Sequence, residues 1–120
     1  MELIPVSDET LPDSIMGELK DQIQFSHMHF RLSCVITDKK GRVLGRGSNQ
    51  SKTHPKFGAK LYRTLHAEAS ALYSCIKRGI NVKGATAYVY RENGKLSKPC
   101  PCCTAILRKF GIKKVYYSFK

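Results

Sequence analysis

The segments Leu65-His66-Ala67-Glu68-Ala69 and Pro99-Cys100-Pro101-Cys102-Cys103 decide the fold of this chain. Each opens an amphipathic stretch that ends at a glycine, Gly79 after the first segment and Gly111 after the second. The apolar positions with helical spacing are Leu65, Ala69, Leu72 and Ile76 in one stretch and Cys103, Ile106, Leu107 and Phe110 in the other. This pattern predicts two helices that begin with titratable or metal-binding side chains and end at a left-handed glycine.

The remaining chain is predicted to form one more helix and several strands. A helix capped by Asp13 or Ser14 is expected to run to about His29, and residues 1–12, which contain two prolines, are expected to form an irregular acidic leader. Strands are predicted at 30–37, 42–48, 85–91 and 113–119, with turns at 38–41 and 92–95 and a loop of functional length at 49–64.

The predicted order is α-β-β-α-β-α-β, an α/β arrangement. Because the later strands alternate with helices, we expect right-handed crossovers and a partly parallel sheet. A helix that follows a strand in such a sheet begins near the carboxyl end of that strand, so the two motifs are expected to meet at one edge. The length of 120 residues fits a single domain, residues 1–120.

The composition, with 42% hydrophobic and 25% charged residues, is that of a soluble globular protein. No apolar run approaches the roughly 18 residues that cross a bilayer, and residues 1–5 lack the features of a signal peptide. We therefore expect a cytoplasmic protein with no membrane partner. Five cysteines are an odd number, and three of them crowd into residues 100–103, which favours metal ligation over a disulfide framework.

The net charge of +12 is unevenly distributed, because residues 1–21 carry −5 and residues 22–120 carry +17. Positions 39–63 contain no Asp or Glu and eight basic residues, which are Lys39, Lys40, Arg42, Arg46, Lys52, Lys56, Lys60 and Arg63. Without counter-charges, this stretch is expected to attract phosphate. A solvated basic face that only keeps the protein soluble is the equally weighted alternative.

Cys100 and Cys103 are three positions apart at a helix start, so their Cβ atoms are expected about 5–6 Å apart on one face, which suits two Zn–S bonds of about 2.3 Å. Pro101 fits the first turn, where no backbone N–H is required. His66 and Glu68 are separated by about 200° around their helix. They are therefore predicted to flank a metal-bound water rather than to chelate together.

One histidine and two cysteines, His66, Cys100 and Cys103, make a set of three zinc ligands. Catalytic zinc sites keep one position open in this way, whereas structural sites are usually closed by four ligands. Two thiolates weaken zinc as a Lewis acid, so Glu68 is predicted to be the base. Separately, the histidine also fits a cap or surface residue, and Cys-x-x-Cys fits a redox pair or half of a structural zinc finger. Jointly, the motifs match the signature of zinc deaminases.

These residues resemble the cytidine and deoxycytidylate deaminase superfamily over about residues 30–119. The stretch from Pro99 to Tyr117 is similar to the deoxycytidylate branch and to small phage deaminases, and His66 as the first ligand favours that branch over tetrameric cytidine deaminases. The resemblance implies a three-layer α-β-α cytidine deaminase-like fold with a mixed sheet. The fold is expected to be shortened at the C-terminus, which leaves a sheet edge to be covered by self-association or by the leader.

The resemblance also implies roles for individual residues. Glu68 would take a proton from the attacking water and carry protons to N3 and to the departing amine of cytosine. The Ala67 N–H would hold the base carbonyl, and Asn49 would contact the sugar, with a plain turn residue as the alternative for Asn49. The candidate phosphate ligands are Lys52, Lys56, Lys60 and Arg63.

The predicted function is zinc-dependent hydrolytic deamination, which converts the cytosine of a free nucleotide to uracil and releases ammonia. Deoxycytidylate is the first candidate substrate. The excess positive charge favours a second hypothesis, a deaminase acting on cytosine or adenine in single-stranded DNA or RNA, including tRNA. A third hypothesis is a catalytically inactive zinc fold that binds nucleic acid. The expected partner is a small-molecule nucleotide, with single-stranded nucleic acid and a homo-oligomer as open alternatives.

Overall fold

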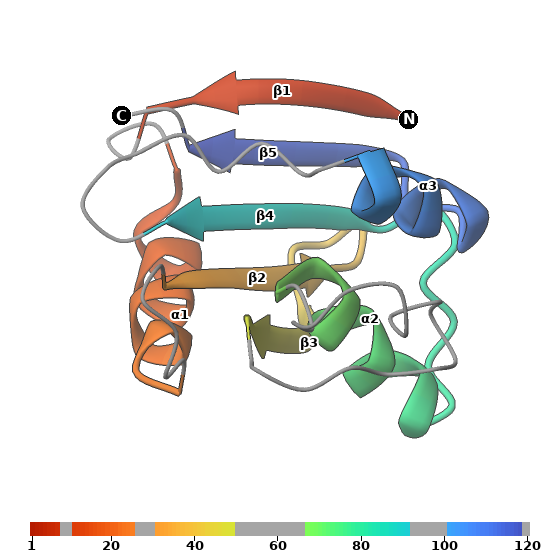
Figure 1. The fold of residues 1–120 in the computed structure, drawn as a ribbon, viewed down its shortest axis with the longest axis horizontal. Helices are drawn as coiled ribbons and strands as arrows, with labels where there is room; N and C mark the ends of the chain where they lie inside the picture. Colours follow the sequence, from red (N-terminus) through yellow and green to blue (C-terminus); the bar gives the residue numbers. More distant parts are fainter. Residues whose placement is uncertain (8–10, 26–30, 50–66, 92–100, 119–120) are drawn as a thin grey trace.

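The computed structural model describes residues 1–7, 11–25, 31–49, 67–91 and 101–118, apart from the side chains of residues 101 and 102. These residues form five strands and three helices (Figure 1). In chain order the elements are β1 (Glu2–Val6), α1 (Asp13–Ile23), β2 (Leu32–Thr37), β3 (Val43–Ser48), α2 (Ala67–Lys77), β4 (Thr86–Arg91), α3 (Pro101–Lys109) and β5 (Lys114–Ser118). The observed order therefore adds one strand at the start of the predicted series.

The strands form one mixed sheet in the order β1-β5-β4-β2-β3. β2 is antiparallel to both β3 and β4, whereas β4, β5 and β1 run parallel, so the predicted hairpin and the partly parallel sheet are confirmed. Since β3 and β4 run in the same direction, their C-terminal residues lie at the same end of the sheet. The chain leaves both strands at this end before it reaches α2 and α3.

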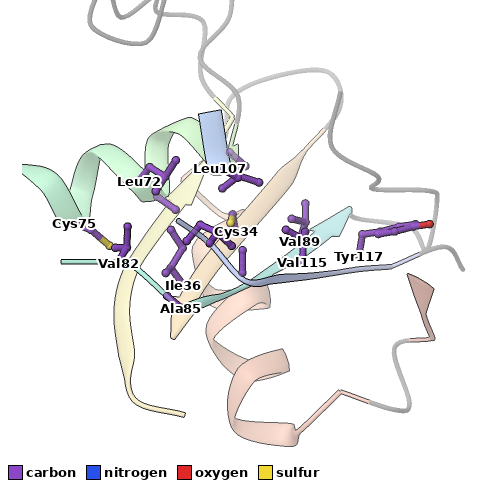
Figure 2. Packing of buried hydrophobic residues seen from close by; sticks show 14 residues of the cluster. Cys34, Ile36, Leu72, Cys75, Val82, Ala85, Val89, Leu107, Val115 and Tyr117 are labelled. Atoms are coloured by element: carbon purple, nitrogen blue, oxygen red, sulfur yellow. The ribbon is translucent and has the colours of Figure 1, made fainter. Parts of the chain in front are cut away.

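Helices cover both faces of the sheet, which confirms the predicted three-layer arrangement (Figure 1). α1 packs over β2, β3 and β4, and its Leu19 and Ile23 share a cluster with Val35 of β2. α2 and α3 cover the opposite face, where the larger core lies (Figure 2). That core includes Cys34, Ile36, Leu72, Cys75, Val82, Val89, Leu107 and Val115. Alternate residues of β2 therefore face different layers.

Glu2–Val6 form a strand, so the prediction of an irregular leader over residues 1–12 is wrong. β1 pairs in parallel with β5, with Leu3 opposite Val115 in the register. Pro5 argued against a strand in the sequence, but β1 lies at the edge of the sheet, where a proline without an N–H is tolerated. Self-association and the leader were the two alternatives for covering the sheet edge, and this pairing places residues of the leader along β5.

α1 begins and ends differently from the predicted helix. Its N-cap is Pro12, which forms no side-chain capping bond, so the prediction that Asp13 or Ser14 caps the helix is wrong. The Pro12 carbonyl accepts the first helical hydrogen bond from the Met16 N–H at 2.9 Å. The helix ends at Ile23, several residues earlier than predicted.

The other elements lie within one or two residues of their predicted bounds. Gly79 and Gly111 have φ angles of 73° and 84°, so both helices of the large core end at a left-handed glycine, as predicted. The predicted turn at 92–95 and the predicted loop after Asn49 lie outside the described residues. Within the described ranges, no helix is long and apolar enough to cross a membrane.

Candidate active site

Glu68 is buried at the start of α2, with only 4% of its surface exposed. Carboxylates are normally in contact with water, and burying one is costly unless its charge is stabilised. Ala67, the first residue of α2, is 1% exposed, so the beginning of the helix lies inside the protein. The start of a helix stabilises nearby negative charge, which makes this position suitable for an ionised carboxylate.

Cys34 of β2 is the titratable neighbour of Glu68 that the sequence did not single out. Its thiol is fully buried, and burial raises the pKa of Cys34 well above its usual range. The negative charge of Glu68 raises this pKa further, followed by Cys75. Glu68 therefore lies close enough to the sheet to act on Cys34 electrostatically. The alternating pattern of residues 30–37 in the sequence could have indicated this neighbour, because it places Cys34 on one of the two faces of the strand.

Two glycines of β3 allow α2 to approach the sheet closely. A Cβ atom on Gly47 would lie 2.3 Å from the backbone nitrogen of Ala71, and one on Gly45 would lie 2.4 Å from Cys75 Sγ. Both distances are far shorter than an ordinary van der Waals contact, so only glycine fits at these positions. β3 thereby sets the position of the first turn of α2, which carries Glu68.

α3 begins at Pro101, which confirms the prediction that this proline occupies the first turn. Cys103 follows in the same turn and is 3% exposed. α3 contacts α2, and both helices contribute to the same core on one face of the sheet. The structure therefore places two predicted functional side chains, Glu68 and Cys103, in buried positions at the starts of neighbouring helices.

Among the described residues at these helix starts, Cys103 is the one predicted zinc ligand. A cysteine in the first turn of a helix is favoured as a thiolate by the helix dipole, and the thiolate is the form that binds metal. The other two predicted ligands, His66 and Cys100, lie outside the described residues but directly precede the first residues of α2 and α3. Among the described residues alone, no three His, Cys, Asp or Glu side chains gather. The complete ligand set stays a prediction.

Asn49 lies directly after β3 and is held against the start of β2. Its Oδ1 accepts a hydrogen bond from the Leu32 N–H at 2.9 Å, and its own backbone N–H donates to the Leu32 carbonyl at 3.1 Å. With 8% of its surface exposed, Asn49 has a fixed, nearly buried carboxamide. Its role toward a sugar stays a prediction. The loop cations proposed for phosphate, Lys52, Lys56, Lys60 and Arg63, lie outside the described residues.

Residues 8–119 match the family described as the cytidine and deoxycytidylate deaminase zinc-binding region. Because this match covers most of the chain, the protein belongs to that family. The resemblance inferred from the His-Ala-Glu and Cys-x-x-Cys motifs is confirmed.

Two curated relatives match part of the chain. ComE operon protein 2 of Bacillus subtilis (strain 168) is 42% identical over 57 residues, which are 47% of this chain and 26% of that protein. The deoxycytidylate deaminase of Enterobacteria phage T2 is 33% identical over 64 residues, which are 53% of this chain and 30% of that protein. The matched segments thus span less than a third of the length of either relative.

Solved structures show the same fold. A cytidine deaminase from Burkholderia pseudomallei superimposes with a TM-score of 0.69 at 19% identity, over 92% of this chain and 86% of that chain. The dCMP deaminase from the cyanophage S-TIM5 superimposes with a TM-score of 0.61 at 24% identity, over 88% of this chain and 84% of that chain. These likenesses confirm the predicted cytidine deaminase-like fold.

Proposed function

We propose that the protein is a zinc-dependent deaminase that converts the cytosine of a free nucleotide to uracil and ammonia, with deoxycytidylate as the first substrate to test. The observation that carries this proposal is the burial of Glu68 and Cys103 at the starts of two neighbouring helices. Membership of the cytidine and deoxycytidylate deaminase family supports the reaction. The phage T2 relative and the cyanophage structure, both deoxycytidylate deaminases by name, support the choice of nucleotide.

His66, Cys100 and Cys103 would hold the zinc ion. When bound, zinc acts as a Lewis acid and lowers the pKa of water at the site. Cys103 is almost fully buried, so a thiolate there needs a compensating positive charge in addition to the start of α3. The positive charge of a bound zinc ion would meet this requirement.

Glu68 would move the protons of the reaction. Its carboxylate would accept a proton from the attacking water and deliver it to N3 of the cytosine. It would then pass the second proton of that water to the amine, so that the C4–N4 bond breaks, ammonia leaves and C4 becomes a carbonyl. Glu68 ends in its starting state. Burial keeps the carboxylate out of bulk water, where competing proton transfers would occur.

The remaining contacts would orient the substrate. The bond from Leu32 fixes the Asn49 carboxamide, so its NH₂ group is the part that would donate to a sugar hydroxyl. The backbone N–H of Ala67, at the start of α2, would hold the base carbonyl. The phosphate would be bound by loop cations, for which the candidates are Lys52, Lys56, Lys60 and Arg63.

The substrate is tested by offering the zinc-loaded chain deoxycytidine, deoxycytidylate, deoxycytidine triphosphate and a short single-stranded oligonucleotide, and measuring ammonia release. Deoxycytidylate is expected to react with the highest kcat/KM. Turnover of the oligonucleotide alone would replace the proposal with a polynucleotide deaminase. No turnover of any of the four would overturn it.

The proton-transfer role is tested with Glu68→Gln, which keeps the shape of the side chain but removes its basicity. The variant is expected to keep its zinc content and its thermal unfolding midpoint while losing at least about 10²-fold in kcat. Glu18→Gln, on the exposed side of α1, is the matched control and should leave kcat unchanged. An unaltered kcat in Glu68→Gln would exclude Glu68 as the base.

A further inference from the structure

A tightly hydrogen-bonded turn joins β2 to β3 at the end of the sheet opposite to Asn49. Asp38 Oδ1 accepts the backbone N–H groups of Lys40 and Arg42, both at 2.9 Å, and Asp38 Oδ2 accepts Arg42 Nε at 2.7 Å. The backbone bond from Arg42 is the largest of the contacts that lower the pKa of Asp38. The one carboxylate of this turn is therefore already paired with a cation.

The loop between α2 and β4 faces this turn. Asn81 Oδ1 accepts the backbone N–H of Lys83 at 3.0 Å, and Gly84, at φ 80°, donates its N–H to the Gly111 carbonyl at 2.7 Å. Lys39 Cε lies 3.4 Å from the place that a Cβ on Gly84 would take. The aliphatic part of the Lys39 side chain thus reaches from the turn to the loop. Hydrogen bonds that involve backbone groups hold both the turn and the loop in place.

Between the turn and the loop lies an open cavity of about 230 Å³, here called the hairpin-end cavity. Lys39, Lys40 and Lys83 line it together with the neutralised pair of Asp38 and Arg42. In the part of the chain that the structure describes, no carboxylate forms an ion pair with these three lysines. The cavity therefore gathers the positive charge of three lysines, which no ion pair among the described residues compensates.

The hairpin departs from regular pairing beside this cavity. Ile36 pairs with Gly45, but Thr37 pairs with Val43, so Leu44 is the extra residue of a β-bulge. Leu44 also lines the hairpin-end cavity. A bulge bends its strand and increases the local twist. The shape of the cavity is thus built into the strand pairing and does not depend on surface side chains alone.

The volume of this cavity and the residues that line it determine which class of ligand it can bind. Sites for drug-sized ligands usually enclose roughly 300–1,000 Å³ and present aromatic or apolar walls. The hairpin-end cavity is smaller, and none of the described residues that line it is aromatic. Lysine ammonium groups act as point charges that bind phosphate without a fixed geometry. A phosphate group fits these properties better than a nucleobase does.

We propose that the hairpin-end cavity binds a chain of phosphates, as found in free polyphosphate and in nucleoside triphosphates. Its position separates it from the candidate active site, because the six residues of β2 span roughly 17 Å between Asn49 and the turn. The proposal does not rest on the proposed deaminase activity, since it uses only residues at the other end of the sheet.

The test is titration calorimetry of the full chain with tripolyphosphate at low ionic strength. Saturable one-site binding is expected, weakened about tenfold or more in the double variant Lys39→Gln/Lys83→Gln. Glutamine keeps a polar side chain of similar reach, so the packing of both stems is largely retained. Lys20→Gln, which removes one charge from the outer side of α1, is the matched control and should change the dissociation constant by less than about twofold.

A second arm compares tripolyphosphate with adenosine triphosphate. Because the cavity has no aromatic wall among its described residues, the nucleoside should add little, and the two dissociation constants should agree within about threefold. Backbone amide shifts on titration should centre on Lys40 and Gly84. If the double variant fails to fold, Lys39→Gln alone is measured. Absence of saturable binding, equal weakening by Lys20→Gln, or shifts confined to other residues would overturn the proposal.

Discussion

Cys34 and Cys75 lie fully buried between α2 and the sheet. Burial is the main cause that raises the pKa of both thiols, and Arg78 offsets only part of the effect at Cys75. The thiolate is the form that reacts with alkylating reagents, so both cysteines should be inert in the folded protein. Their chemistry is that of core residues, although one of them is a neighbour of Glu68.

Alkylation with iodoacetamide at pH 8, followed by peptide mass spectrometry, checks this expectation. Cys34 and Cys75 should be labelled at least about 10²-fold more slowly in the native protein than in urea, because labelling requires opening of the core. The same peptides from the unfolded chain serve as the control. Comparable rates in the two states would show that the thiols are accessible.

The ion pair between Glu18 and Arg46 gives a pH-dependent prediction. Its hydrogen bond from Arg46 is the largest cause that lowers the pKa of Glu18 below the ordinary 4.5. A lowered pKa in the folded state means that the pair stabilises the protein fully above pH 4.5 and loses this contribution as the pH falls through the folded-state pKa. Both side chains are partly exposed, so the contribution is at most about 1 kcal/mol.

Thermal unfolding of Glu18→Gln should therefore show a slightly lower midpoint than the wild type at pH 7. The difference should shrink as the pH is lowered below 4.5. Glu2→Gln, at an exposed position of β1, is the control and should show no difference at either pH. A gap in midpoint that stays constant into acid would contradict the assigned role of the pair.

At the scale of elements, the approach of α2 to β3 determines where Glu68, the proposed catalytic carboxylate, lies. Gly45 and Gly47 face α2 at distances that exclude any side chain. The helix therefore rests directly on the strand, and its first turn, with Glu68, is buried as a consequence. A substitution of one of these glycines should therefore alter the candidate active site, although a glycine has no side chain that could take part in the reaction.

Gly47→Ala should destabilise the protein by about 1–3 kcal/mol, because the new Cβ forces α2 away from the sheet. The same variant should lose the proposed deaminase activity by a larger factor than it loses folded protein. Gly17→Ala is the matched control, since nothing lies within 4 Å of its Cβ position and alanine favours the helix by about 0.5–1 kcal/mol. Urea unfolding measures both. Equal stability of Gly47→Ala and wild type would contradict the close approach.

At the scale of the whole molecule, the first residues complete the sheet. β1 covers the edge of β5 over five paired positions, and Leu3 packs against the large core. An uncovered edge exposes unpaired N–H and C=O groups that can pair with another chain. The start of the chain is thus a structural part of the domain.

Removal of residues 1–6 should lower the thermal unfolding midpoint and increase self-association, because β5 then becomes the edge strand. Sedimentation velocity and thermal unfolding of the truncated and complete chains test this. Pro5→Ala, at an exposed position of β1, is the control and should leave both properties nearly unchanged. A truncated chain with the same midpoint and the same sedimentation would show that β1 contributes little.

Local patterns were sufficient for most elements. The helical spacing after Glu68 and Cys103, the glycines that follow and the polar turn at 38–41 each report on their own neighbourhood, and the structure has α2, α3 and the hairpin within a few residues of prediction. Glu68 and Cys103 lie at helix starts, as the sequence predicted, whereas their burial is seen only in the structure. The roles of His66, Cys100 and the loop cations stay predictions, because those residues lie outside the described ranges.

The sequence by itself determined the family and the order of the elements from α1 to β5, because periodicity and motif spacing are local properties. Only the tertiary structure decided that β1 pairs with β5, that Pro12 begins α1 and that Cys34 lies near Glu68. It also decided that the lysines of the β2–β3 turn face Lys83 across a cavity. Pairings of this kind join residues far apart in the chain, so their energy depends on contacts that no single segment contains.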